Sequence, residues 1–247
     1  YKTMQIKPLF IVILLSSFSF MHAQEYTFGV KGGINFNNIG ELYHNGNNSG
    51  LGTNVTPNDD TVFSAEKEMG FQFGAFAMIA FDKFFIRPEV VYVSSKNNYP
   101  LALKTAYWTS TKIDIPILLG YKVYEPVSLY IGPSFSSISD MKLDAVEQGS
   151  NYPYVYKKSS TSINAGILAE FGRFGVDLRY QYGITKVEEL RVDINRGIYG
   201  TNIAELLEYN PSQIQLSVHI NIIKINGNDG GHRIKSGWRG GNRGCLN

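Results

Sequence analysis

The sequence has one cysteine among its 247 residues, Cys245, so no internal disulfide can hold the fold together. Histidine is also scarce, and the four histidines show no paired spacing that would suit a metal ion. These shortages argue against a disulfide-rich small domain and against a structural zinc site. We therefore expect no metal and no other cofactor.

The chain also has little excess charge. Its formal net charge is +2, from 23 basic and 21 acidic residues. Taking away Lys2 and Lys7, which lie in the expected signal peptide, leaves 21 basic residues against the same 21 acidic ones. Nucleic-acid-binding domains are usually strongly basic, so this balance argues against a nucleic-acid partner.

Residues 9–20 form the one long apolar run near the amino end. Lys2 and Lys7 precede this run and Ala23 follows it, which is the order of a secretory signal peptide over residues 1–23. A membrane anchor is the alternative, but a spanning helix needs roughly 20 apolar residues. The sequence therefore predicts export of the mature chain.

Residues 112–123, KIDIPILLGYKV, carry the clearest structural signal. Every second side chain is apolar, from Ile113 to Val123, whereas the alternate positions hold charge, glycine, proline and one leucine. Successive side chains of a β-strand point to opposite faces, so this is the period of a strand. The sequence abounds in residues that suit such strands and their turns, with 16 tyrosines, 15 phenylalanines and 25 glycines.

The same alternation recurs along the chain and predicts eight strands, at residues 24–38, 69–81, 84–94, 112–123, 127–137, 161–171, 174–185 and 212–222. The connections alternate in length. Short turns are expected at 82–83, 124–126 and 172–173, and long polar loops at 39–66, 95–110, 138–158 and 186–210, with a helical turn within 204–208. Prolines at 88, 116 and 133 require a bulge or a locally open pairing.

Short turns on one side and long loops on the other are typical of bacterial outer-membrane barrels. The predicted fold is all-β: an eight-stranded antiparallel transmembrane β-barrel over residues 24–225, with short periplasmic turns and long extracellular loops. The apolar face of each strand would contact lipid. A soluble β-sandwich or lipocalin-like barrel has the same strand period but no reason to sort its loops by length.

Residues 226–247 are rich in glycine and basic side chains, without alternation. Such a composition cannot bury a core, so we expect a disordered tail. A segment that binds a partner is the alternative.

With the strands assigned, the sequence resembles the Bacteroidota outer-membrane β-barrel family that is often called PorT-like. The matching segments are FGVKGGINFNNI (28–39), IRPEVVY (86–92), KIDIPILLGYKV (112–123), LYIGPSF (129–135), AGILAEFG (165–172) and VDLRYQYGIT (176–185). The resemblance implies an outer-membrane location and a non-enzymatic accessory or scaffold role in a membrane complex, such as a protein secretion apparatus.

The inward positions of the predicted barrel carry a nearly balanced set of charges. We expect a structural network of Lys31, Arg87, Glu89, Asp114, Lys122, Glu170, Asp177 and Arg179. Eight strands leave an interior just wide enough for side chains, and buried charges must then be paired. The expected result is a plugged lumen, and a narrow polar conduit is the alternative.

Little in the sequence favours catalysis. His44 lies in the first long loop with Asp59 and Asp60, but a histidine in a loop is more often a solvated surface residue, which is what we expect here. The same loop lacks the ordered ligand spacing of a calcium site. Beside the scaffold role, two hypotheses stay open: a stand-alone structural or adhesion barrel, and a narrow pore or small-ligand binder.

Overall fold

The computed structural model describes residues 24–44, 61–146, 149, 152–201 and 203–226. The prediction of a signal peptide over 1–23 concerns residues outside these ranges, as does the predicted tail over 226–247 apart from Asn226, which is the last residue of a strand. Eight long strands make up most of the described chain: β1 (Gln24–Asn38), β5 (Met69–Phe81), β6 (Phe84–Pro100), β7 (Thr105–Tyr124), β8 (Val127–Leu143), β9 (Ser159–Phe171), β10 (Phe174–Gly183) and β13 (Ser212–Asn226).

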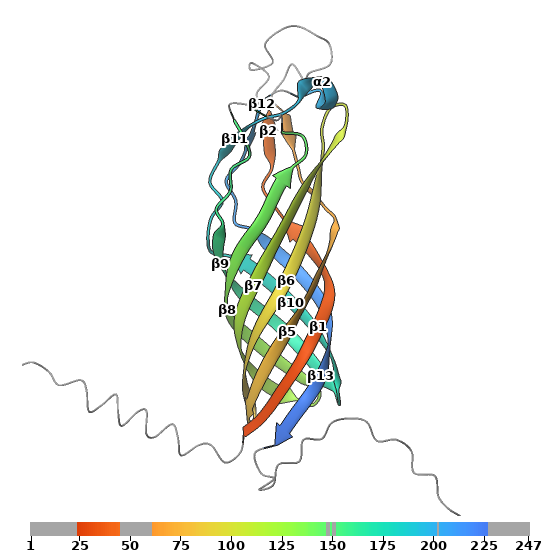
Figure 1. Ribbon diagram of the computed structural model, residues 1–247, viewed down its shortest axis with the longest axis vertical. Helices are drawn as coiled ribbons and strands as arrows, with labels where there is room; N and C mark the ends of the chain where they lie inside the picture. The colour runs from red at the N-terminus through yellow and green to blue at the C-terminus, as the bar shows by residue number, and fades with distance from the viewer. Residues whose placement is uncertain (1–23, 45–60, 147–148, 150–151, 202, 227–247) are drawn as a thin grey trace, which may run out of the picture.

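These strands close into a ring. Each long strand pairs antiparallel with the next along the chain, and β1 pairs with β13, for example Gly32 with Val218, which joins the first strand to the last. The pairing of β6 with β7 completes the circle (Figure 1). The predicted eight-stranded antiparallel barrel is therefore confirmed.

The short connections all lie at the end of the barrel where β1 starts and β13 finishes (Figure 1). They are Asp82-Lys83, Glu125-Pro126 and Gly172-Arg173. Gly172 has a φ of 64°, in the left-handed region that glycine enters without steric cost. This turn therefore has the residue that its backbone needs.

The strand faces divide as the alternation predicts. Ile117 is 46% exposed on the outside, and the next residue, Leu118, is fully buried inside. On β10, Leu178 is 48% exposed, whereas Asp177 is fully buried. An outside wall of apolar side chains over a polar interior is the arrangement that lipid requires of a barrel.

The prolines interrupt the ladders, as expected. The pairing of β6 with β7 is interrupted between Pro88 and Val91 of β6. The unpaired stretch of β7 on the opposite side contains Pro116. Proline has no N–H to donate, so the ladder opens there. Glu89 lies inside this open stretch of β6.

Several predicted loops are wrong in extent, because three strands continue beyond the band of apolar outward side chains. β6, β7 and β8 have 17, 20 and 17 residues, whereas roughly 9–11 suffice to cross a bilayer. Outward side chains turn polar beyond Tyr92, Ile113 and Phe135, which made these extensions look like loops in the sequence. The predicted loop at 95–110 is a hairpin whose strands end at Pro100 and begin at Thr105.

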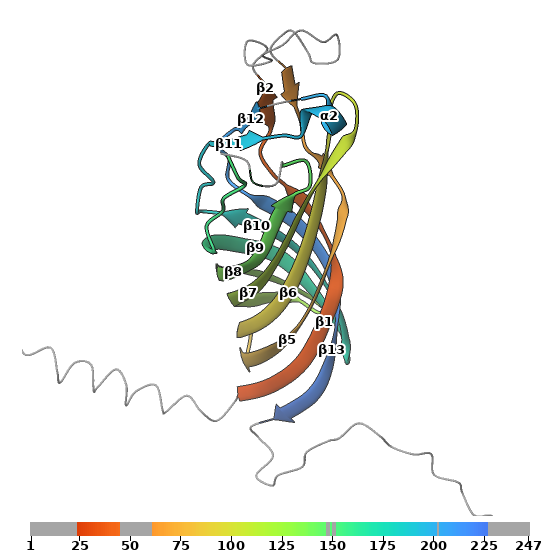
Figure 2. The ribbon, with the colours of Figure 1, turned by 45° about the horizontal axis from the view of Figure 1, so that its top comes forward.

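A small cap lies beyond the barrel at the end opposite the short turns (Figure 2). Its four-stranded sheet has the order β11 (Leu190–Asp193), β12 (Ile203–Leu206), β2 (Leu42–His44) and β3 (Thr61–Phe63). The helix α2 (Arg196–Tyr199) precedes β12, and β4 (Glu66–Lys67) pairs with β6. The predicted helical turn at 204–208 is wrong: its first residues belong to β12.

The cap has a hydrophobic core of its own. It contains Ile39, Leu42, Phe63, Tyr99, Leu101, Ala106, Trp108, Leu143, Ala145, Val192, Ile194, Tyr199, Ala204 and Leu206. The Tyr99 hydroxyl donates a hydrogen bond to the Gly40 carbonyl at 2.6 Å, and burial raises the pKa of Tyr99 above its usual range. The outer end of the barrel is therefore a folded unit rather than a set of open loops.

Candidate functional site

An ion cluster occupies the lumen of the barrel. Glu89 from β6 lies at its centre and contacts three cations: Lys31 Nζ at 3.2 Å, Arg87 Nε at 2.9 Å and Arg179 Nη2 at 2.9 Å. Asp177 from β10 accepts from Lys31 Nζ at 2.8 Å and from Arg179 Nη2 at 3.0 Å. All five side chains are buried, so the cluster ties β1, β6 and β10 together across the interior.

Neutral side chains also contact these charges, although Arg87 Nε and Nη2 have no hydrogen-bond partner among the described residues. The Tyr130 hydroxyl donates to Asp177 and accepts from Arg179 Nε at 3.0 Å. The Arg87 guanidinium lies 3.9 Å from the centre of the Phe76 ring, a cation–π contact. Hydrogen bonds and neighbouring charges offset the cost of removing these ions from water.

Below the ions, toward the short turns, the lumen contains an apolar cluster beside buried polar side chains such as Thr27, Ser128 and His219. Phe76, Met78, Ala80, Phe85, Leu118, Tyr130 and Leu168 form one buried cluster. Gly120 makes room for it, because a Cβ there would lie 2.0 Å from the Phe85 ring. This apolar plug was missed in the sequence, although its residues occupy the inward positions of their strands.

The other predicted members of the network lie apart from the cluster. Asp114 pairs with Lys112 at 3.0 Å and accepts from Gln181 at 3.2 Å. Glu170 is 3.7 Å from His219 Nε2, and its side chain is 21% exposed. Lys122 is half-buried near the β7–β8 turn.

His44 is not the solvated loop residue that the sequence suggested. It lies in β2 and is fully buried, with Nδ1 3.2 Å from the Ile203 carbonyl oxygen. Asp59 and Asp60, its potential partners, lie outside the described residues. Within the part of the chain that the structure describes, no three His, Cys, Asp or Glu side chains come together as a metal site.

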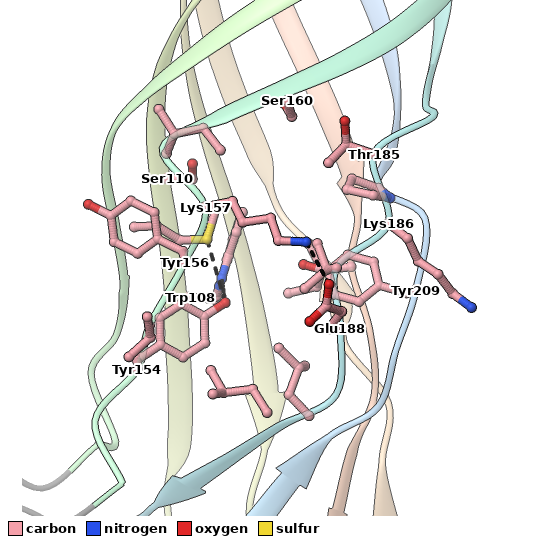
Figure 3. Close-up of a pocket in the computed structure, with 18 of the residues that line it drawn as sticks. Trp108, Ser110, Tyr154, Tyr156, Lys157, Ser160, Thr185, Lys186, Glu188 and Tyr209 are labelled. Atoms are coloured by element: carbon pink, nitrogen blue, oxygen red, sulfur yellow. Dashed lines mark hydrogen bonds and ion pairs between the residues drawn. The ribbon is translucent and has the colours of Figure 1, made fainter.

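A cavity of about 310 Å³ lies between the cap and the lumen. Most of its lining comes from β7, β8 and two segments, residues 154–160 and 185–190 (Figure 3). The Trp108 indole N–H donates to the Tyr154 hydroxyl at 3.0 Å, and burial raises the pKa of Tyr154 to about 12. Sequence reasoning missed this cavity, because most of its lining comes from segments that were predicted to be loops.

Comparison with known protein families decides the identity. The family model for the outer membrane protein β-barrel domain matches residues 22–189. The chain belongs to this family. This outer-membrane barrel is therefore a protein of the cell outer membrane, with its exposed apolar wall in contact with lipid. Among the described residues, no helix is long and apolar enough to cross a membrane.

Solved structures similar to this outer-membrane barrel include two bacterial surface proteins. Neisserial surface protein A is 13% identical, with a TM-score of 0.42, over 78% of this chain and 96% of the other. Ail, the attachment invasion locus protein of Yersinia pestis, is 11% identical, with a TM-score of 0.38, over 83% of this chain and 99% of its own. No curated protein matches the sequence.

Proposed function

We propose that this protein is a non-enzymatic, non-conducting barrel that anchors a folded cap at the outer face of the membrane. The observation that carries the proposal is the filling of the lumen. The Lys31, Arg87, Glu89, Asp177 and Arg179 cluster lies above the apolar plug, and both are buried. Two layers of buried side chains favour a closed interior, as is usual in barrels of eight strands.

The chemistry of the cluster supports a structural role. Each of its two carboxylates is bound to at least two cations, so neither is free to act as a base or a nucleophile. Buried charge networks of this kind hold elements in one arrangement. We assign the same structural role, outside the main cluster, to Asp114, Lys122 and Glu170.

Planar-bilayer recordings test the absence of conduction. The purified protein is expected to insert without producing current steps, because ions would have to displace a paired charge cluster and cross the apolar plug. A porin reconstituted in the same way supplies the positive control. Discrete, voltage-stable steps from the wild-type barrel would contradict the proposal and favour the narrow conduit.

A second candidate is a scaffold role in a membrane complex, as the resemblance to the PorT-like family implies. Two exposed apolar side chains at the outer tip favour it. Leu103 and Ile198 are both more than half exposed, and the Leu103 N–H donates to the carbonyl of Tyr199, the neighbour of Ile198, at 3.1 Å. Neighbouring exposed apolar side chains can form part of a contact with a protein partner.

Co-purification from native membranes separates this candidate from a stand-alone barrel. We expect partner proteins with the wild-type chain, and fewer with Leu103→Asp, which places a charge in the contact. Lys104→Asp, at the adjacent exposed position, is the matched control. Recovery of the wild-type barrel alone would leave the stand-alone anchor as the function.

A further inference from the structure

The cavity beneath the cap exists because the barrel wall is uneven at its outer rim. The pairing of β8 with β9 ends at Ser137 and Ser159, but β8 continues to Leu143 with β7 as its neighbour. The segments 154–160 and 185–190 complete the wall on this side. The cavity lies just beyond the apolar band, since the outward side chain of β8 at this height is Ser137.

Most of the cavity wall is apolar. Its apolar side chains include Ile39, Trp108, Met141, Tyr154, Leu206 and Tyr209. Its volume of about 310 Å³ is at the small end of ligand pockets, which span roughly 300–1,000 Å³. An apolar, aromatic-rich wall of this size suits one short chain or one ring.

The floor of the cavity is polar. Asn37, Lys112 and Ser160 line both the main cavity and a second space of about 40 Å³ below it. In this second space the hydroxyls of Ser136 and Ser162 and the amide oxygen of Gln213 are buried, and none has a hydrogen-bond partner among the described residues. Buried polar groups left in this state are costly, so a hydrogen-bonding group from a ligand would be stabilised here.

The floor carries no uncompensated charge. Lys112 Nζ is 3.0 Å from an Asp114 carboxylate oxygen and donates to Gln181 at 3.2 Å. An ionic head group would therefore meet a neutral pair and become an unpaired buried charge, which is strongly unfavourable. A hydroxyl or amide head group avoids this cost and can use the unpaired oxygens.

One exposed ion pair lies on the solvent side of the cavity lining. Lys157 and Glu188 come from the two segments that complete the wall, and their charged atoms are 2.7 Å apart. Figure 3 shows the two side chains directed toward each other among the lining residues. An exposed ion pair contributes little free energy, so it opens readily to the outside.

We infer that this cavity binds a small uncharged amphiphile, with its aliphatic or aromatic body beside Trp108 and its hydrogen-bonding head on the Asn37, Lys112 and Ser160 floor. This site is separate from the lumen plug, so the barrel would remain closed while the ligand is bound. The binding function goes beyond the proposed anchor role.

Trp108 provides the readout, because the chain has only two tryptophans and the other is Trp238. In a Trp238→Phe background, Trp108 is the sole source of tryptophan fluorescence. The probe is bromo-octanol, with bromine at the end opposite the hydroxyl, added to the full chain in lipid nanodiscs. We expect saturable quenching, because a bromine atom in contact with the indole quenches its emission.

Two matched variants test the location. Ser110→Phe fills the cavity and is expected to abolish saturable quenching, whereas Ser137→Phe, on the outer face of β8, should leave it unchanged. Circular dichroism verifies folding, and Ser160→Phe replaces Ser110→Phe if that variant does not fold. Quenching that never saturates, or that is equal in the filled and control variants, would overturn the site.

A further probe tests the polar head. Bromo-octane has the same apolar body without a hydroxyl, so it cannot satisfy the floor. Its half-saturation concentration is expected to be about tenfold higher, the effect of losing a hydrogen bond to a buried group. Equal half-saturation for the two probes would overturn the assignment to an amphiphile.

Discussion

Replacing Glu89 by glutamine is expected to lower the free energy of unfolding by about 3–5 kcal/mol, the usual cost of breaking a buried ion pair. Glu89 contacts Lys31, Arg87 and Arg179, and within the described ranges no other carboxylate touches all three. Glutamine keeps the shape but removes the charge, leaving three buried cations with Asp177 alone. Urea unfolding in lipid vesicles, followed by circular dichroism, measures the change.

Glu170→Gln is the matched control for Glu89→Gln. Glu170 also points into the barrel, but its partner His219 is 3.7 Å away and its carboxylate is partly exposed. Partly solvated pairs contribute about 0–1 kcal/mol, so the control should unfold close to the wild type. Equal losses in both variants would show that the five-residue cluster has no special role.

The sequence sufficed to assign residues to the inside or outside of the barrel, because a strand has a period of two. It did not show which inward charges meet. Lys31 and Asp177 are 146 positions apart, and their contact depends on the stagger of the strands around the ring. Glu170 and Lys122 point inward like Asp177 but lie nearer the short turns. The prediction from the sequence therefore placed them in one network with residues that the strand register keeps apart.

The outer rim was the part least accessible to sequence reasoning. Outside the bilayer, a strand no longer needs apolar outward residues, so Lys96 and Asn98 on β6 look like part of a loop. The cap sheet pairs Leu42 with Leu206, from segments that no local pattern connects. The cavity beneath the cap follows from these long-range pairings.

Ile117→Arg is the second substitution with a large expected effect. Ile117 lies near the middle of the apolar outer face of β7, which runs from Ile113 to Val123, and its side chain is exposed to lipid. An arginine near the bilayer midplane is expected to cost about 2–4 kcal/mol of folding free energy. The same vesicle-based urea titration measures it.

Val123→Arg is its control, because it lies on the same face of the same strand but next to the β7–β8 turn. Near the interface the cost falls to about 0–1 kcal/mol, since the guanidinium reaches water. In lipid, the free-energy cost of an arginine depends steeply on its depth along the strand. A soluble protein with the same outer face would not show this dependence. If Ile117→Arg folds and inserts like Val123→Arg, this face of β7 is not the lipid-facing one.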